Sequence, residues 1–221
     1  MSQEEGMYLR DIVRYEDDGA GRLSREVVSV ASGQNLAMGA VLGKITKSTP
    51  TTGTHTPASP ANSGSGTCTG VTAGINTKIG SYVLTALSAT AFAVTDPDGL
   101  ALPDAVVGTA YANANINFTI NDGSPDFSAG DTFTIAVTAG AETVKEINFD
   151  AVDGTQNAHG ILTAACDATG GATNAVAVTN TAVIVAANLV WPTTSPAVTA
   201  DQKAAALAQL AAKGIVARDE A

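Results

Sequence analysis

Most of the chain consists of short runs in which Val, Ile, Ala and Thr alternate with polar residues, separated by Gly, Asp and Asn. Alternation with a period of two is typical of half-buried β-strands. Four such runs occupy 81–87, 90–96, 116–122 and 131–137. Because DPDG and NDGS supply turn chemistry between them, this region is expected to form an antiparallel β module, for which an immunoglobulin-like sandwich is one available form. The sequence therefore predicts a mainly β protein.

Similar strand patterns lie on both sides of this module. Two precede it, in 26–31 and 41–45, and two follow it, in 175–179 and 182–185. The stretch 47–66 is rich in Thr, Ser, Pro and Gly, lacks hydrophobic periodicity and is expected to be a linker. Since strands need partners, the outer runs are expected to pair with each other. We therefore predict one β domain split into 22–46 and 142–221, with the module 67–141 inserted between its halves.

One helix is signalled, close to the C-terminus. Thr199 and Gln202 have the spacing of a capping box, in which each side chain accepts a hydrogen bond from the other residue's backbone N–H. Gly214 stands where a left-handed residue ends a helix, and a hydrophobic Ile follows it. The sequence predicts a helix over 200–213 with an apolar stripe made of Ala204, Leu207, Ala208, Leu210 and Ala211.

Charge and composition exclude several classes of function. With 11 Lys and Arg against 21 Asp and Glu, the net charge of −10 repels phosphate backbones, so nucleic acid is not expected as a direct partner. No apolar run approaches the roughly 18 residues of a membrane span, and the acidic N-terminus does not resemble a signal peptide. Cys68 and Cys166 lie far apart without a CxxC motif, which favours buried thiols over a disulfide framework.

No residues form a recognisable catalytic or metal-binding motif. His55 lies in the predicted linker and His159 precedes a strand, and no GxSxG elbow accompanies either of them. Asp96 and Asp98 belong to a DPDG turn that lacks the further ligands of a calcium loop. We therefore expect no catalytic residue, no metal and no cofactor, and we do not expect an enzyme.

Two segments are candidates for contact with other proteins. Residues 1–21 mix four apolar anchors with acidic clusters, so they are expected to be an arm that orders on a partner and lies outside the core; the anchors are Tyr8, Leu9, Ile12 and Val13. Trp191, the only Trp, stands beside Pro192. A Trp of this kind is either a core plug or the anchor of an interface, and both interpretations remain open.

Three stretches together resemble the tailed-bacteriophage head decoration proteins, in particular those similar to the phage lambda one. These stretches are LSREVVSVASGQNLAMGAVLGKIT, HGILTAACDATGG, and LVWP followed by ADQKAAALAQLAAKGIVAR. The resemblance implies a small β-rich domain with one C-terminal helix. It also implies a homotrimer, made in the bacterial host cytoplasm, that binds the major capsid protein at three-fold sites on the outside of the expanded head. There it would stabilise the virion against the pressure of packaged DNA.

The resemblance assigns roles to the two candidate segments. The anchors of residues 1–21 are carried over as the capsid-contact arm, by position in the chain and not by a matching motif. Within the trimer that the resemblance implies, we predict that Trp191 and Pro192 lie at the interface. The family pattern lacks the inserted module, which leaves an alternative function open. In that alternative the protein is an adhesive or glycan-binding module displayed on the virion, and the insert contacts the host surface.

Overall fold

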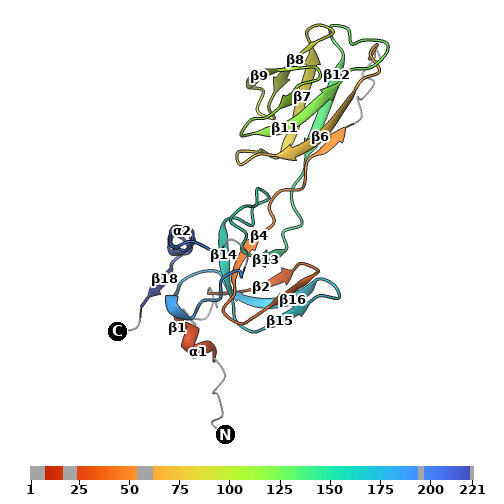
Figure 1. Cartoon of the computed structure of the whole chain (residues 1–221). Helices are drawn as coiled ribbons and strands as arrows, with labels where there is room; N and C mark the ends of the chain where they lie inside the picture. Colours follow the sequence, from red (N-terminus) through yellow and green to blue (C-terminus); the bar gives the residue numbers. More distant parts are fainter. Residues whose placement is uncertain (1–7, 17–23, 54–61, 194–196, 220–221) are drawn as a thin grey trace. The chain divides into compact units, whose positions relative to one another are not determined.

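The computed structural model describes residues 8–16, 24–53, 62–193 and 197–219. It is mainly β, as predicted, and it divides into two compact units (Figure 1). Unit 1 comprises Met1–Thr46 and Ala141–Ala221, and unit 2 comprises Lys47–Gly140. Each unit has a hydrophobic core of its own.

A small closed barrel forms the centre of unit 1. Its strands follow the order β13-β2-β16-β14-β4, with bounds Val144–Glu146, Arg25–Val30, Thr173–Val178, Ala158–Leu162 and Val41–Lys44. The predicted pairing of the outer runs is confirmed, since β16 lies antiparallel to β2 with Ala175 opposite Val28. Strands such as β4 bury side chains on both faces, which explains their continuous rather than alternating apolar runs. Two short strands, β3 (Gln34–Leu36) and β15 (Cys166–Ala168), pair beside the barrel.

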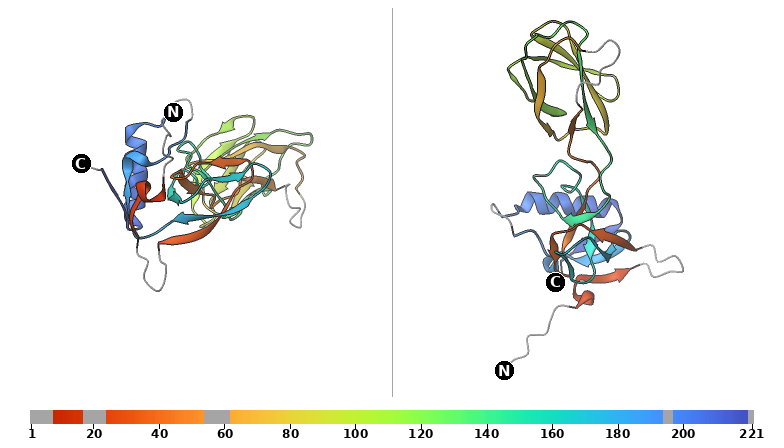
Figure 2. Two further views of the ribbon diagram at one scale, coloured as in Figure 1. Left: turned by 90° about the horizontal axis from the view of Figure 1, so that it is seen from below. Right: turned by 90° about the vertical axis from the view of Figure 1, so that its right-hand side faces the viewer.

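A second layer covers the barrel. It contains the sheet β1-β17-β18, with bounds Val13–Glu16, Ala182–Val185 and Ile215–Arg218, together with helix α2 (Ala200–Ala212) and the 3₁₀ helix η1 (Ala186–Asn188). The left-hand view of Figure 2 shows α2 running alongside the blue strands of this layer. Between the layers lies a cluster of buried side chains that includes Val41, Ile161, Ile184, Leu210 and Ile215.

The ends of α2 agree with the prediction, but its buried face does not. Gln202 N donates to Thr199 Oγ1 (3.2 Å) and Thr199 N donates to Gln202 Oε1 (2.9 Å), which completes the capping box. The buried residues are Ala206 and Leu210, whereas Ala204, Ala208 and Ala211 of the predicted stripe are exposed. Ala occurs all around this helix, so hydrophobicity alone does not fix which side packs against β14 and β18.

The N-terminal segment is not the unattached arm that the sequence predicted. Residues Leu9–Ile12 form the short helix α1, and β1 then pairs with β17. Ile12 and Val13 are buried in the core of unit 1, so their assignment to an arm outside the core is wrong. The physical reason is a close fit at Gly39, where an added Cβ would lie 2.8 Å from Ile12 Cδ1. Residues 1–7 and 17–21 of the predicted arm lie outside the described residues.

Unit 2 is built from two antiparallel sheets that share one core. One sheet has the order β10-β11-β6, with bounds Ala110–Tyr111, Ile116–Asn121 and Thr67–Ala73. The other has the order β5-β12-β7-β8-β9, with bounds Thr51–Gly53, Thr132–Val137, Gly80–Ala86, Ala91–Thr95 and Ala101–Val106. Phe118 and Ile120 from the first sheet and Phe92 and Phe133 from the second belong to the same buried cluster. Unit 2 is therefore a two-layer sandwich.

Part of the predicted linker 47–66 belongs to this sandwich. Residues Thr51–Gly53 form β5 on the edge of β12. Ser63 N and Gly64 N each donate to a carboxylate oxygen of buried Asp131 (2.9 Å). Burial alone would raise the pKa of Asp131, but the N–H groups of Ser128, Ser63 and Gly64 outweigh it and lower that pKa. These residues have few apolar side chains and are held by hydrogen bonds, so the hydrophobic pattern of the sequence did not reveal them. Residues 54–61 lie outside the described residues.

Excision of Lys47–Gly140 should leave unit 1 folded. Glu142 N donates to Ile45 O (3.0 Å) and Ile45 N donates to Thr143 O (2.9 Å), so the unit already has the hydrogen bonds of a hairpin. Joining Thr46 directly to Ala141 leaves the three residues Thr46, Ala141 and Glu142 in the loop, and Glu142 already has the positive φ (58°) with which three-residue hairpin loops end. We expect a midpoint in urea within about 0.5 M of that of unit 1 in the full chain, measured by circular dichroism. An insoluble product, or one without a cooperative transition, would contradict this.

Candidate functional site

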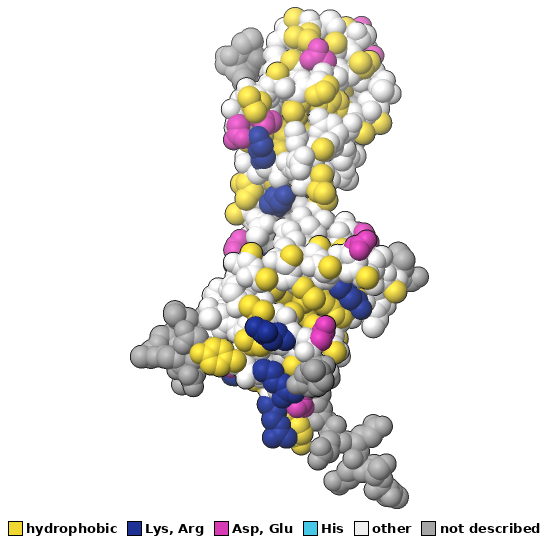
Figure 3. Space-filling model, turned by 90° about the vertical axis from the view of Figure 1, so that its left-hand side faces the viewer, with side chains coloured by type: hydrophobic (Ala, Val, Ile, Leu, Met, Phe, Trp, Pro, Cys, Tyr) yellow, Lys and Arg dark blue, Asp and Glu magenta, His cyan; other side chains and the backbone are white. Residues whose placement is uncertain are grey.

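The first site candidate is an exposed surface formed by α1 and β1. Tyr8 and Tyr15 are 52% and 61% exposed. The guanidinium carbon of Arg10 lies 4.9 Å from the centre of the Tyr8 ring, and Arg14 Nη1 donates to Arg10 O (3.1 Å). We name these four residues, Tyr8, Arg10, Arg14 and Tyr15, the Tyr–Arg surface. In Figure 3, Lys and Arg side chains likewise gather beside hydrophobic ones on unit 1.

Strand register extends this surface across the sheet. Tyr15 lies opposite Val183, which lies opposite Val216, and Val216 is 41% exposed. The neighbouring positions Ile184 and Ile215 face the core. The sequence pointed to Tyr8 and Leu9 here but not to Tyr15, because strict alternation would place Tyr15 on the same buried face as Val13. A β-bulge between Val13 and Tyr15 breaks the alternation, and Tyr15 is exposed as a result.

The second candidate surrounds Trp191. Its ring is half-buried, stacks on Phe149 with centroids 6.5 Å apart, and lies 5.7 Å from Lys203 Nζ. Pro192 is buried and lines a groove of about 390 Å³, together with residues that include Phe149, Glu146 and Gln202. Trp191 therefore packs within its own unit while part of the ring stays accessible beside a groove.

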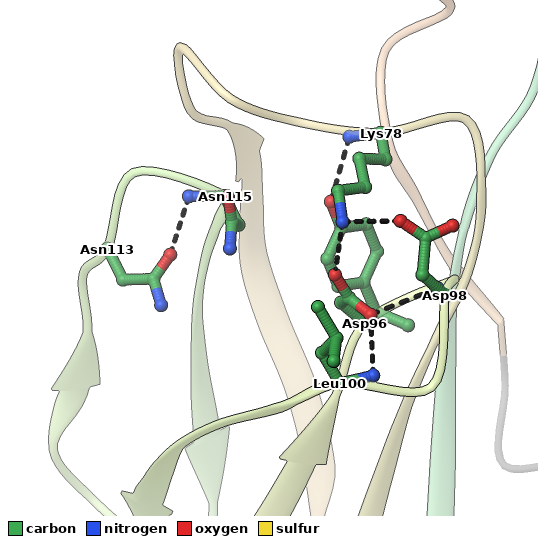
Figure 4. Close-up of polar contacts among 7 residues, drawn as sticks. Lys78, Asp96, Asp98, Leu100, Asn113 and Asn115 are labelled. Atoms are coloured by element: carbon green, nitrogen blue, oxygen red, sulfur yellow. Dashed lines mark hydrogen bonds and ion pairs between the residues drawn. The ribbon is translucent and has the colours of Figure 1, made fainter.

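In unit 2 a charged network closes one end of the sandwich (Figure 4). Lys78 Nζ lies 2.6 Å from Asp96 Oδ2 and 2.5 Å from Asp98 Oδ2. Asp96 Oδ1 accepts hydrogen bonds from Asp98 N (3.0 Å) and Leu100 N (2.9 Å), which confirms the predicted turn. In the adjacent loop Asn113 Oδ1 accepts from Asn115 N (2.5 Å). The Lys78 ammonium occupies the space between the two carboxylates, so the network is a structural tie between loops.

Acid should weaken unit 2 through this network. Hydrogen bonds from the Lys78 ammonium, and then from the backbone N–H of Leu100, lower the pKa of Asp96 below its ordinary value near 3.8. The unfolded chain then takes up a proton first as pH falls, so the stability present above about pH 4 decreases toward the folded-state pKa. We expect Asp96→Asn to lower the stability at pH 7 and to flatten this dependence, as measured by urea unfolding from pH 7 to 2.5.

The matched control is Asp126→Asn, the same exchange at an exposed loop position. It should leave both the stability at pH 7 and the acid dependence as they are in the unchanged chain. If Asp96→Asn and Asp126→Asn had the same stability at every pH, Asp96 would not be the cause of the acid sensitivity.

The remaining chemistry is limited in the part of the chain that the structure describes. Cys68 and Cys166 are free and buried, as expected, and burial raises the pKa of Cys68 to about 11. Among the described residues, no group of three or more His, Cys, Asp or Glu side chains could hold a metal ion. The helices in these ranges include none long and apolar enough to cross a membrane. His159 lies beside Lys213 in unit 1, and His55 falls outside the description.

Comparison with solved structures returns two crystal forms of Xanthomonas campestris FlgL. They are 18% and 17% identical to this chain, with TM-scores of 0.32 and 0.30. The matches cover 49% and 53% of this chain and only 34% and 33% of those chains. This chain therefore matches about a third of the length of those structures, and likeness at this level establishes no shared fold. No curated protein matches the chain.

Comparison with protein families gives a different result. The model of the family described as bacteriophage lambda head decoration protein D matches residues 2–78 and 75–215. The two matches together reach nearly the whole chain, including the split β domain with its terminal helix. Such proteins are structural components of the virion capsid and not enzymes. The chain belongs to the bacteriophage lambda head decoration protein D family.

Proposed function

We propose that this protein binds as a homotrimer to three-fold sites on the outside of the expanded phage head, after synthesis in the host cytoplasm, and stabilises the shell against internal DNA pressure. Two observations together support this proposal. The chain matches the family, and the first described elements of unit 1 carry an exposed surface of aromatic and arginine side chains. The partner is the major capsid protein.

The Tyr–Arg surface has the chemistry of a protein interface. Tyr and Arg are enriched among the residues that dominate binding energy, because they combine large apolar area with directional hydrogen bonding. Tyr8 and Tyr15 are exposed, whereas Ile12 and Val13 are buried in the core. We therefore propose that Tyr8, its neighbours Leu9, Arg10 and Arg14, and Tyr15 contact the capsid. The two buried anchors, Ile12 and Val13, support this surface from inside the unit.

A head-binding experiment tests this contact. The unchanged protein and Tyr8→Ala/Tyr15→Ala are mixed with expanded and unexpanded heads that lack their own decoration protein, and bound protein is counted after sedimentation. We expect binding to expanded heads only, and an apparent Kd at least about tenfold higher for the double variant, since two interface aromatics at about 1 kcal/mol each exceed the 1.4 kcal/mol of a tenfold change. Val27→Ser, at a 67% exposed position on the barrel, is the control for loss of an exposed apolar side chain. Equal occupancy of both head forms would refute the proposal.

The trimer interface is proposed at Trp191 and Pro192. A closed ring buries the same patch in each subunit, and three modest contacts then act together through effective concentration. The accessible part of the Trp191 ring beside its groove is the anchor that one subunit offers to the next.

Matched variants separate this role from packing inside the subunit. Trp191→Ala and Phe149→Ala both remove the ring stacking, but only the first removes the proposed anchor. We expect light scattering to show a mass near three times 22.0 kDa for the unchanged chain and for Phe149→Ala, and a lower mass for Trp191→Ala. Urea unfolding of the two variants should differ little. Identical masses for both variants would place Trp191 in the subunit alone.

A second role for the insert is proposed on the polar outer face of β6 and β11. Asn121 Nδ2 donates to Thr69 Oγ1 (2.8 Å) and Asn117 Nδ2 to Thr72 Oγ1 (3.4 Å). A plane of amides and hydroxyls is suited to hydrogen bonding with sugar hydroxyls on a host surface. A glycan array probed with the full chain and with the chain lacking Lys47–Gly140 tests it. Binding by the full chain alone supports an adhesive module, and signal from neither removes this role.

A further inference from the structure

A second pocket in unit 1 gathers basic and amide side chains around a small hollow. Its volume is about 190 Å³, and it is lined by Lys44, Thr46, Gly154, Asn157, Ala158, His159 and Lys213. One water occupies about 30 Å³ of liquid, so the hollow has room for several waters or one small ion. Three separate parts of the chain, β4, β14 with the loop before it, and the end of α2, bring these residues together.

Hydrogen bonds orient the donors of this pocket. Lys213 Nζ donates to His159 O (2.9 Å) and lies 3.2 Å from His159 Nδ1. If Nδ1 accepts from the ammonium, the neutral ring carries its proton on Nε2, and Lys213 retains a third N–H. Asn157 Oδ1 accepts from Gln209 Nε2 (3.3 Å), which orients the amide, and its Nδ2 carries two N–H groups that can donate to a ligand.

Two lysines line the pocket, and the charges of two glutamates, Glu26 and Glu142, also act on it. Burial, followed by the charges of Lys213 and Lys44, lowers the pKa of His159, while the charges of Glu26 and Glu142 oppose this. Glu142 Oε2 lies 2.6 Å from Lys44 Nζ, whereas the hydrogen-bonding contacts of the Lys213 ammonium are with His159. Burial lowers the pKa of Lys213, and the charge of Glu26 opposes this. A chain with a net charge of −10 thus concentrates Lys44, Lys213 and a titratable imidazole at one hollow.

We propose that this pocket binds a small oxyanion, either inorganic phosphate or the carboxylate of an acidic side chain from another protein. The ligand accepts hydrogen bonds from Lys213, from Asn157 and from the imidazole, and its negative charge relieves the repulsion between the two lysines and protonated His159. Binding strengthens as pH falls because His159 gains a proton. The negative charges of Glu26 and Glu142 oppose the binding of an anion. The site lies outside the Tyr–Arg surface and does not depend on the proposed capsid role.

Proton NMR of the His159 ring in the full-length protein tests the site, with the signal assigned by its loss in His159→Gln. Sodium phosphate and sodium acetate are titrated separately at constant ionic strength set with sodium chloride. We expect a saturable shift and a raised pKa of His159. Saturation by phosphate alone identifies the phosphate ion as the ligand, and saturation by acetate at similar concentrations identifies a carboxylate.

Three variants decide whether the response comes from this pocket. Lys213→Gln removes the central cation, and Asn157→Asp keeps the size of the side chain while adding a negative charge; each should raise the Kd at least tenfold. Lys203→Gln removes a lysine of α2 that does not line the pocket, and this variant should bind as the unchanged protein does. If Lys213→Gln unfolds, Asn157→Asp still gives the answer. A linear shift with either ion, or the same Kd in all variants, overturns the proposal.

Discussion

Replacing Gly43 with Ala should lower the free energy of unfolding of unit 1 by about 3 kcal/mol or more, as expected for overpacking that cannot relax. Gly43 lies in β4 between β13 and β14, opposite Lys145 and Ala158. A Cβ at this position would stand 2.7 Å from the carbonyl carbon and from the Cα of Thr155, and still closer to its carbonyl oxygen. These are backbone atoms, which cannot rotate away as a side chain can.

Thr155 is also unable to retreat. It is buried, its N–H and hydroxyl both donate to Asp153 Oδ1 (2.9 and 2.6 Å), and its carbonyl accepts from Asn148 N (3.0 Å). Urea unfolding followed by the amide signals of unit 1 measures the loss. Gly171→Ala is the control, because an added Cβ there meets nothing within 4 Å, and its effect should stay within about 0.5 kcal/mol. Equal midpoints for Gly43→Ala and Gly171→Ala would show that the loop moves aside.

Replacing Phe92 with Ala should destabilise unit 2 by about 3–5 kcal/mol, the usual effect of removing a buried aromatic side chain. Phe92 is fully buried; its ring centre lies 5.0 Å from that of Phe127 in an edge-on arrangement and 5.8 Å from that of Phe133. The substitution removes the shared member of these two ring pairs and leaves a cavity between the sheets. Since typical domains are stable by only 5–15 kcal/mol, much of the stability of unit 2 would be lost.

Hydrogen exchange resolves where this loss occurs. Amides of β7 and β12 should exchange faster in Phe92→Ala, while amides of β2 and β16 should keep their protection, because the two units have separate cores. Val106→Ala, at a 53% exposed position of β9, serves as the control and should change neither set. Faster exchange in both units would mean that they unfold as one.

Local patterns in the sequence were sufficient for eight of the 18 strands in the described ranges and for the ends of α2. Alternating runs located β7, β8, β11 and β12, and the Thr199–Gln202 capping box fixed the start of the helix. Strands with little apolar alternation were missed. Residues Thr67–Ala73 form β6 with mostly exposed or half-exposed side chains, so their position depends on backbone pairing with β11.

Long-range pairing could not be predicted from local turn signals. The NDGS sequence after β11 is typical of a turn between paired strands, yet β11 pairs with β6 and β12 pairs with β7 and β5. The same limit applies to the candidate sites. Apolar character alone does not distinguish Ile12, which fits against Gly39, from Tyr8, which stays exposed. The pocket of Lys44, His159 and Lys213 comes from three distant stretches and has no signature in sequence.

The way in which the insert joins unit 1 has a mechanical consequence. Both connections leave from the same end of an antiparallel pair, at Lys44 in β4 and Val144 in β13. A pull on the insert would load these two strands in the same direction, so they would slide along β14 and β2 and not peel away from each other. Because ladder hydrogen bonds run across the strands, such sliding strains several of them at once. Tension applied to the insert would therefore reach unit 1 through the β4 and β13 ladders of the barrel.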